Sequence, residues 1–158
     1  MAKRTIGKIY IFKVALEGRK RIWRRIAVRS NQTLDDLHEA IYEAFDRDDE
    51  HLYSFYFSNA VGRGRAWLTD AVEYTHPYNC EQGGFFGDEK MNNAAKTRIG
   101  TLKLKPGRKF KYLFDFGDSW WHEITVEQTD GNADEGKYPR IIERKGKSPP
   151  QYVYEDEE

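Results

Sequence analysis

The fold is decided by Phe114-Asp115-Phe116-Gly117-Asp118-Ser119-Trp120-Trp121-His122-Glu123, a turn-forming segment between two stretches of alternating sequence. Apolar or aromatic residues recur at every second position on both sides of it: Phe110, Tyr112, Phe114 and Phe116, then Trp120, His122, Ile124 and Val126. Such alternation places each set on one face of a β-strand. We predict a hairpin with Gly117-Asp118-Ser119 as a three-residue loop, pairing Phe116 with Trp120 and Phe114 with His122. A two-residue loop would slip the register by one and turn one apolar set to the wrong face.

The composition is that of a single globular domain covering 1–158, with 26 basic and 26 acidic residues among 158. This balance argues against a protein that holds nucleic acid through bulk positive charge. The single cysteine, Cys80, excludes an intramolecular disulfide framework, and no disulfide-linked partner is expected. The chain has no apolar run of membrane-spanning length, so we predict no membrane partner and a cytoplasmic location.

The N-terminal part predicts two strands, a helix and a third strand. Residues 8–16 and 22–28 alternate around the turn Glu17-Gly18-Arg19-Lys20, although Arg24 falls on the core face. Arg24 must therefore be turned outward by a bulge or be buried with a carboxylate partner. Thr33 and Asp36 resemble a capping box ahead of apolar residues at helical spacing, and residues 51–57 read as a strand.

Residues 58–98 lose this periodicity and are rich in glycine and asparagine. We predict a long, irregular and partly mobile insertion here, with a short strand at 66–68 and a mobile tip at 80–93. Residues 99–104 form a short strand or turn, 138–142 add an edge segment, and 153–158 form a disordered acidic tail. The predicted fold class is α+β: a mainly antiparallel sheet of β-hairpins, opening β-β-α-β and closing with a C-terminal hairpin, with one principal helix at about 33–45.

Several motifs occur in a characteristic order: Ile22-Trp23-Arg24-Arg25-Ile26, Thr33-Leu34-Asp35-Asp36-Leu37-His38, His51-Leu52 with Phe55, Phe114 to Trp120, His122-Glu123, and Tyr138-Pro139-Arg140. Over residues 8–150 the chain resembles the plasmid pRiA4b ORF-3-like family, also labelled insertion-element passenger proteins resembling TnpR. The resemblance implies an α+β domain encoded on bacterial or archaeal mobile elements, without an established biochemical activity. The resemblance also implies cysteines after Tyr-Pro-Arg and just before Pro-Pro, followed by acidic residues. This chain departs from that pattern, since those places hold Ile141, Ser148, Gln151 and Tyr152.

The sharpest candidates for chemistry are Asp115, Asp118 and His122, since two carboxylates and an imidazole can bind a divalent metal or exchange protons. The predicted register, however, turns Asp115 away from His122 and leaves Asp118 in the loop. A structural interpretation is then favoured, in which Asp118 bonds turn amides and His122 is a half-buried sheet residue. Asp115 could pair with Arg24 or Arg25. His51 would approach His122 only if their strands are neighbours.

A second set of candidates concerns a partner or nucleic acid: Arg24, Arg25, Arg63, Arg65 and Trp67. The arginines could contact phosphates, and Trp67 could stack on a base. The Gly62-Arg63-Gly64-Arg65 stretch lacks the lysine and following helix of a nucleotide-binding loop.

The sequence favours a non-catalytic binding or adaptor module of mobile-element origin, which presents a sheet face and a long loop to a protein or nucleic acid. No cofactor is predicted for it. The alternative is a metal-dependent hydrolase or nuclease that uses His51, Asp115, Asp118 and His122, and a divalent metal belongs to that alternative alone.

Overall fold

The computed structural model describes residues 7–58, 71–81 and 91–151. Eight strands form one sheet in the order β5-β4-β3-β6-β7-β1-β2-β8. The strands are β1 (Lys8–Leu16), β2 (Arg19–Arg29), β3 (Tyr53–Phe57), β4 (Val72–Thr75), β5 (Met91–Asn93), β6 (Lys109–Phe114), β7 (Trp120–Asn132) and β8 (Arg140–Lys145). The helical segments are α1 (Leu34–Ala44), α3 (Pro77–Glu81) and the 3₁₀ turns η1 (Ala94–Lys96) and η2 (Ile99–Leu102). No helix among the described residues is long and apolar enough to cross a membrane.

At the centre of the sheet, a strand from the N-terminal part of the chain pairs with a strand from the C-terminal part. β1 lies between β2 and β7 and is antiparallel to both, so that Phe12 is opposite Ile26 on one side and Val126 on the other. β8 pairs with the far side of β2, and β3 pairs with β6. Strands that are distant in sequence therefore hold the N-terminal hairpin against the C-terminal one.

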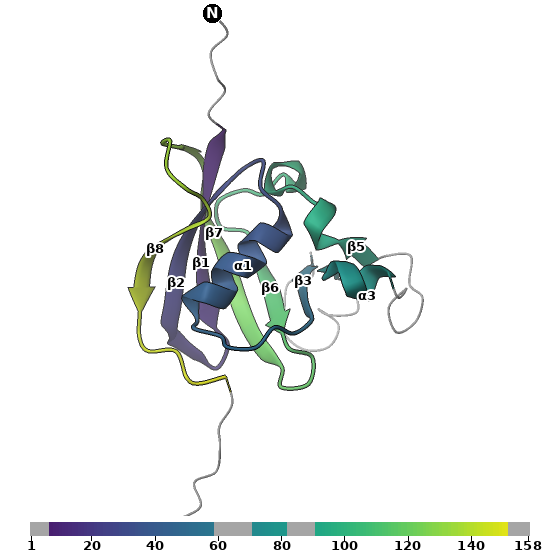
Figure 1. Cartoon of the computed structure of the whole chain (residues 1–158). Helices are drawn as coiled ribbons and strands as arrows, with labels where there is room; N and C mark the ends of the chain where they lie inside the picture. The colour runs from purple at the N-terminus through teal and green to yellow at the C-terminus, as the bar shows by residue number, and fades with distance from the viewer. Residues whose placement is uncertain (1–6, 59–70, 82–90, 152–158) are drawn as a thin grey trace, which may run out of the picture.

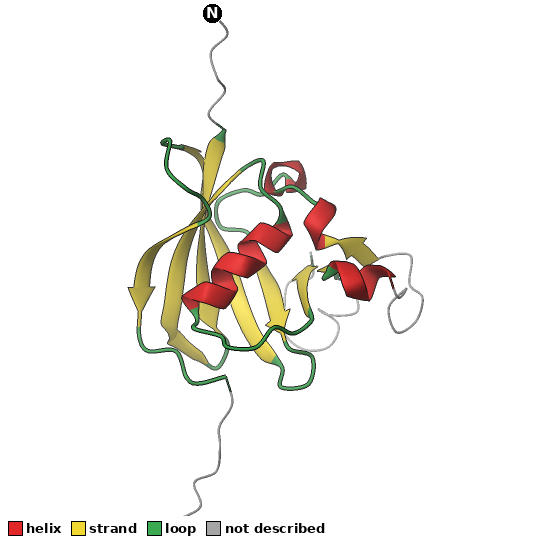
Figure 2. Cartoon of the chain, in the orientation of Figure 1, coloured by secondary structure: helices red, strands yellow, loops and turns green. Residues whose placement is uncertain are grey.

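Helix α1 lies across one face of the sheet and closes the core (Figures 1 and 2). The predicted capping box is confirmed, because the Thr33 side chain accepts from the Asp36 amide and the Asp36 carboxylate accepts from the Thr33 amide. Leu34, Leu37 and Ile41 are buried at the spacing of one helical face. The helix thus begins one residue after its predicted cap and turns its apolar side to the sheet.

The strands of the sheet present two contrasting faces. The covered face, under α1, is built from aromatic and aliphatic residues that are almost fully buried, among them Phe12, Val14, Ile26, Phe55, Phe110, Phe114, Ile124 and Val126. The opposite side of β3, β6, β7, β1, β2 and β8 we call the open face. Its half-exposed residues include Lys13, Trp23, Arg25, Tyr56, Lys111, Trp121, Glu123 and Thr125.

The predicted fold class was wrong. The sheet is mixed, because β4 and β5 run parallel. In addition to α1, the described part of the chain contains a second α-helix, α3. A β-hairpin can be recognised from the few residues of its turn and the strands beside it. The β4–β5 pair is instead joined through a long connection, and the sequence shows no periodic pattern there. The strands involved have only four and three residues, too short to show alternation.

The predicted hairpin register was shifted by two residues. Phe114, not Phe116, is opposite Trp120, and Tyr112 is opposite His122, so five residues form the loop. An even shift keeps every side chain on its predicted face, except that Phe116 leaves the strand and is 38% exposed. In this longer loop the backbone turns through positive φ angles at Asp115 and Ser119.

The described parts of 58–98 contain regular elements. β4 pairs with β3, β5 pairs with β4, and α3 follows β4. The strand predicted at 66–68 and most of the mobile tip predicted at 80–93 lie outside the described residues, as does the acidic tail at 153–158. Residues 99–102 form the turn η2, and the edge segment predicted at 138–142 appears as β8.

Candidate functional site

The loop between β6 and β7 is organised by Asp115. Its Oδ1 accepts from the amides of Gly117 at 3.0 Å and Asp118 at 3.3 Å, and its backbone carbonyl accepts from the Ser119 amide. The Asp115 amide in turn donates to the carbonyl of Leu52. The side chain that bonds the turn amides is therefore Asp115 and not Asp118, which is exposed. Asp115 can take this place because Asp tolerates the left-handed conformation, here with φ 66°.

The structure brings together only one pair of the four residues predicted for catalysis. His51 Nε2 lies 3.4 Å from Asp115 Oδ2, and the His51 ring meets Phe114 edge-on. Asp115 is 6% exposed, so this pair sits at the base of the loop.

His122 is fully buried and uses both ring nitrogens elsewhere. Its Nε2 accepts from Arg47 Nη2 at 3.1 Å, which leaves Nδ1 as the donor that faces the Tyr112 carbonyl at 3.4 Å. Burial, assisted by the nearby Arg47 cation, lowers the pKa of His122 to about 3. His122 is therefore a neutral core residue, and it is joined to neither Asp115 nor Asp118.

Arg47 is a buried cation that is held by aromatic rings. It is 6% exposed, and its guanidinium lies 4.5 Å from the Trp120 ring centroid. Burial lowers its pKa to about 10, so the side chain stays charged at neutral pH. Its Nη1 and the Trp120 Nε1 are buried and find no hydrogen-bond partner in residues 7–58, 71–81 and 91–151. The sequence interpretation missed Arg47, which it read as part of an acidic run.

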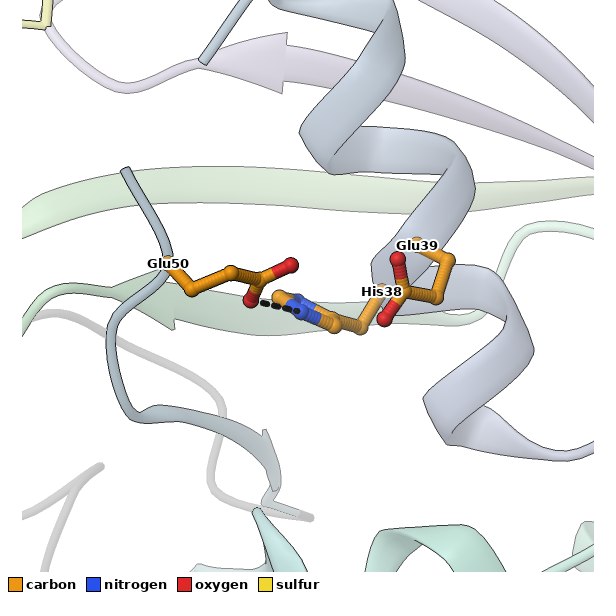
Figure 3. A group of neighbouring side chains, drawn as sticks. All are labelled: His38, Glu39 and Glu50. Carbon is orange, nitrogen blue, oxygen red and sulfur yellow. Dashed lines mark ion pairs between the residues drawn. The ribbon is translucent and has the colours of Figure 1, made fainter. Parts of the chain in front are cut away.

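A second polar cluster gathers where α1 meets the loop before β3. His38, Glu39 and Glu50 each offer a ligand atom, and these atoms lie within 4.8 Å of one another (Figure 3). His38 Nε2 faces Glu50 Oε2 at 3.7 Å, while both carboxylates are exposed. One imidazole and two carboxylates form a donor set suited to a divalent cation. This is where the described residues could hold a metal.

The His38 ring is held by two tyrosines. It stacks on Tyr53 at 3.8 Å, and its Nδ1 lies 2.6 Å from the hydroxyl of Tyr112. Burial, and then the nearby His76, lower the pKa of His38 to about 3, which keeps the imidazole neutral. The opposite nitrogen, Nε2, is buried and has no hydrogen-bond partner within the described part of the chain. An unsatisfied buried polar atom costs about 1–3 kcal/mol, so this position calls for a ligand.

The arginines predicted to bind a partner have different environments. Arg24 is 2% exposed and donates to the carbonyls of Ala44, Trp23 and Lys145, so its partners are carbonyls rather than the expected carboxylate. Arg25 lies on the open face, where it is bidentate to Glu127 and also bonds Glu143. The Asp115 side chain contacts Gly117, Asp118 and His51, and among these contacts of its loop there is neither Arg24 nor Arg25. Arg63, Arg65 and Trp67 lie outside the described residues.

The open face combines aromatic rings with paired charges. Trp23 lies between the Lys13 ammonium at 5.0 Å and the Arg25 guanidinium at 4.8 Å. Trp121 packs against Tyr56 with their ring centroids 5.6 Å apart. Ion pairs accompany the rings: Lys111 with Glu17, Lys109 and Lys20 with Glu123, and Arg25 with Glu127 and Glu143.

These features define a protein built on one β-sheet. A helical layer covers one face of the sheet and encloses neutral histidines, and the other face carries aromatic and charged residues. The chain belongs to the plasmid pRiA4b ORF-3-like protein family, whose model matches residues 8–155, which confirms the resemblance read from the motifs. It is 30% identical over 133 residues to the uncharacterized protein y4hQ of Sinorhizobium fredii. That match covers 84% of this chain and 59% of y4hQ, so the chain spans less than two thirds of that relative.

A solved structure has a fold similar to that of this chain. The crystal structure of MM3350 from Methanosarcina mazei Go1, described as a protein of unknown function, matches with a TM-score of 0.69 and 26% sequence identity. The match covers 93% of this chain and 74% of that one. The fold is therefore common to the plasmid-associated family and an archaeal protein.

The sequence interpretation did not name His38, Glu39 and Glu50 as ligands. A signal was present, since a histidine stands on the apolar side of a predicted helix with Glu39 beside it. Glu50, however, is twelve residues from His38, and only the path of the loop after α1 returns it to the ring.

Proposed function

We propose that the protein is a non-catalytic binding module that docks a protein partner on its open face. The observation that carries this proposal is the dispersal of the predicted catalytic residues. His122 is enclosed with Arg47, Asp115 organises a turn, and Asp118 is exposed at that turn. A hydrolase built on these side chains would need them to converge around one substrate.

Charge pairing on the open face favours protein over nucleic acid as the partner. Arg25 is matched by Glu127 and Glu143, and Lys111 is matched by Glu17. A phosphate backbone on this face would meet these carboxylates as well as the cations, which removes most of the gain from counterion release. A protein surface with its own mixed charges can complement both signs.

The aromatic residues of the open face supply the anchors for such a contact. Trp23, Trp121 and Tyr56 are half-exposed on β2, β7 and β3, strands that are each separated from the next by one strand of the sheet. Tryptophan and tyrosine dominate the binding energy of protein interfaces, because they bury large apolar areas with little loss of side-chain entropy. The long side chains of Lys13 and Arg25 lie against Trp23 and would form a polar rim.

The test uses three versions of the full chain as immobilised bait in a nuclease-treated extract of the source cells. They are the wild type, a Trp23→Ala/Trp121→Ala variant, and a Tyr78→Ala control at a residue that is 57% exposed on α3. Each captured protein is identified, purified and titrated calorimetrically against all three versions. Tm and the circular dichroism spectrum establish that each version is folded.

The proposal predicts that a purified partner binds the wild type and the Tyr78→Ala control alike, and binds the double variant at least tenfold more weakly. Equal affinity for all three versions would overturn it. So would binding that is lost on nuclease treatment and restored by added nucleic acid, with a steep dependence on salt.

A further inference from the structure

We propose that His38, Glu39 and Glu50 form a zinc-binding site that ties helix α1 to the loop before β3 (Figure 3). The site lies on the helical side of the sheet and is independent of the open face. The proposal starts from the His38 side chain, which is 1% exposed and whose Nε2 has no hydrogen-bond partner among the residues that the structure describes. That nitrogen is directed toward a carboxylate oxygen of Glu50.

The spacing of the ligand atoms suits a tetrahedral ion. Zinc bonds to nitrogen and oxygen at about 2.0–2.2 Å, so two ligand atoms of a tetrahedral site lie roughly 3.4 Å apart. His38 Nε2 and Glu50 Oε2 are 3.7 Å apart, and all three ligand atoms lie within 4.8 Å. The buried imidazole is rigid, while the two exposed carboxylates need only small side-chain rotations to close on the ion.

The surroundings of His38 match those of a metal ligand. With Nε2 on the ion, Nδ1 carries the proton and donates to the Tyr112 hydroxyl, 2.6 Å away. A hydrogen bond of this kind to the second ring nitrogen fixes the tautomer and the orientation of ligating histidines. Stacking on Tyr53 then prevents the ring from rotating away from the carboxylates.

The loop that carries Glu50 is held by the C-terminal segment. Gln151 Oε1 accepts from the amides of Asp48 at 2.7 Å and Asp49 at 3.1 Å, and Gln151 Nε2 donates to the Asp49 carbonyl. Since Gln151 is 3% exposed, these contacts form a fixed support. The position of Glu50 is therefore organised before an ion arrives.

The donor set selects the class of metal. An imidazole favours zinc and its transition-metal neighbours over magnesium or calcium, which prefer sites made entirely of oxygen. Three protein ligands leave one position for water, and both glutamates face solvent. The ion would therefore exchange with the medium, and its binding would follow the available zinc concentration.

The experiment is calorimetric titration of the full chain, freed of metal by chelation and dialysis, with zinc chloride. Glu39→Gln and Glu50→Gln test the ligands, because both side chains are exposed and their replacement leaves the core intact. Glu43→Gln is the matched control, one turn along α1 and also exposed. Cys80→Ser tests whether the thiol of Cys80 binds the zinc instead.

The expected result is one zinc per chain, an affinity at least tenfold weaker in each ligand variant, and an unchanged affinity in Glu43→Gln and Cys80→Ser. Zinc at a hundredfold excess over Kd should raise Tm by roughly 5–10 °C in the wild type. The ¹⁵N resonance of His38 Nε2 should move on zinc addition while that of Nδ1 moves less. Wild-type affinity in the Glu39→Gln/Glu50→Gln double variant, loss of binding in Cys80→Ser, or no binding below millimolar zinc would overturn the assignment.

Discussion

The two faces of the central strands stabilise their polar groups in different ways, and the neighbouring residues Arg24 and Arg25 illustrate the contrast. Arg24 points to the covered face, where it is buried and bonds three backbone carbonyls. Arg25 points to the open face and pairs with two glutamates in contact with solvent. The covered face therefore encloses the charge of Arg24 in bonds to the backbone, whereas the open face keeps the charge of Arg25 matched but accessible.

This difference separates the face that governs stability from the face proposed for binding. On the covered face the histidines are neutral and the arginines are enclosed, so substitutions there should chiefly affect folding. On the open face, paired side chains contribute little to stability, because surface ion pairs are worth about 0–1 kcal/mol. Residues on that face are thus free to serve a partner.

The largest expected difference between the faces comes from removing an aromatic ring. Phe12→Ala should lower the free energy of unfolding by about 3–5 kcal/mol, because Phe12 is fully buried and its loss leaves a cavity. Trp23→Ala should cost less than half as much, since Trp23 is half-exposed and stacks on two cations. Urea titration of both variants measures the difference, and equal losses would mean that the open face is part of the core.

A smaller difference is expected between the two arginines. Arg24→Met should destabilise the protein by about 2–3 kcal/mol, because the carbonyls of Trp23 and Lys145 lose a charged donor, while Arg144 still donates to the Ala44 carbonyl. Arg25→Met should change stability by less than about 1 kcal/mol, as for an exposed ion pair. The same urea titration tests this pair, and a larger effect at Arg25 would contradict the contrast.

A third difference concerns pH and separates buried from exposed groups. The folded-state pKa of His122 is about 3, below the ordinary value of 6.5, so the unfolded chain takes up a proton first as pH falls. The stability contribution is complete above pH 6.5 and is lost as pH decreases toward 3, at about 1.4 kcal/mol per pH unit.

His122→Gln keeps an acceptor for Arg47 but cannot titrate, so its stability should fall less steeply between pH 6 and pH 4. Trp121→Phe, on the open face, should retain the wild-type slope. Chemical denaturation across this pH range provides the measurement. A His122→Gln slope identical to that of the wild type would show that the histidine is protonated in the folded protein.

The sequence predicts those features that depend on local patterns. Alternation located the strands around Phe12 and Ile124 on the correct face, and the Thr33 cap located α1. The loop length was missed because non-glycine residues, Asp115 and Ser119, adopt positive φ angles there. The mixed sheet was missed because β4 and β5 are short and pair across a long connection.

The candidate site was harder to predict than the fold. The sequence does not indicate that Arg47 is the partner of His122, because the two residues are 75 positions apart. The His38 cluster likewise depends on the path of a loop, and on Tyr112 from a distant strand for the orientation of the ring. Spacing along the chain identifies ligands that lie on one element, but it cannot identify those assembled from several.

The most direct test of the account is hydroxyl-radical footprinting of the protein, alone and in complex with its purified partner. The method reports the exposure of side chains, so it distinguishes the two sides of the same strand. We expect Trp23, Trp121 and Tyr56 on the open face to lose reactivity in the complex, while the exposed Tyr78 and Phe116 keep theirs. Protection of Tyr78 or Phe116 with unchanged reactivity at Trp23 and Trp121 would contradict the assignment of binding to the open face.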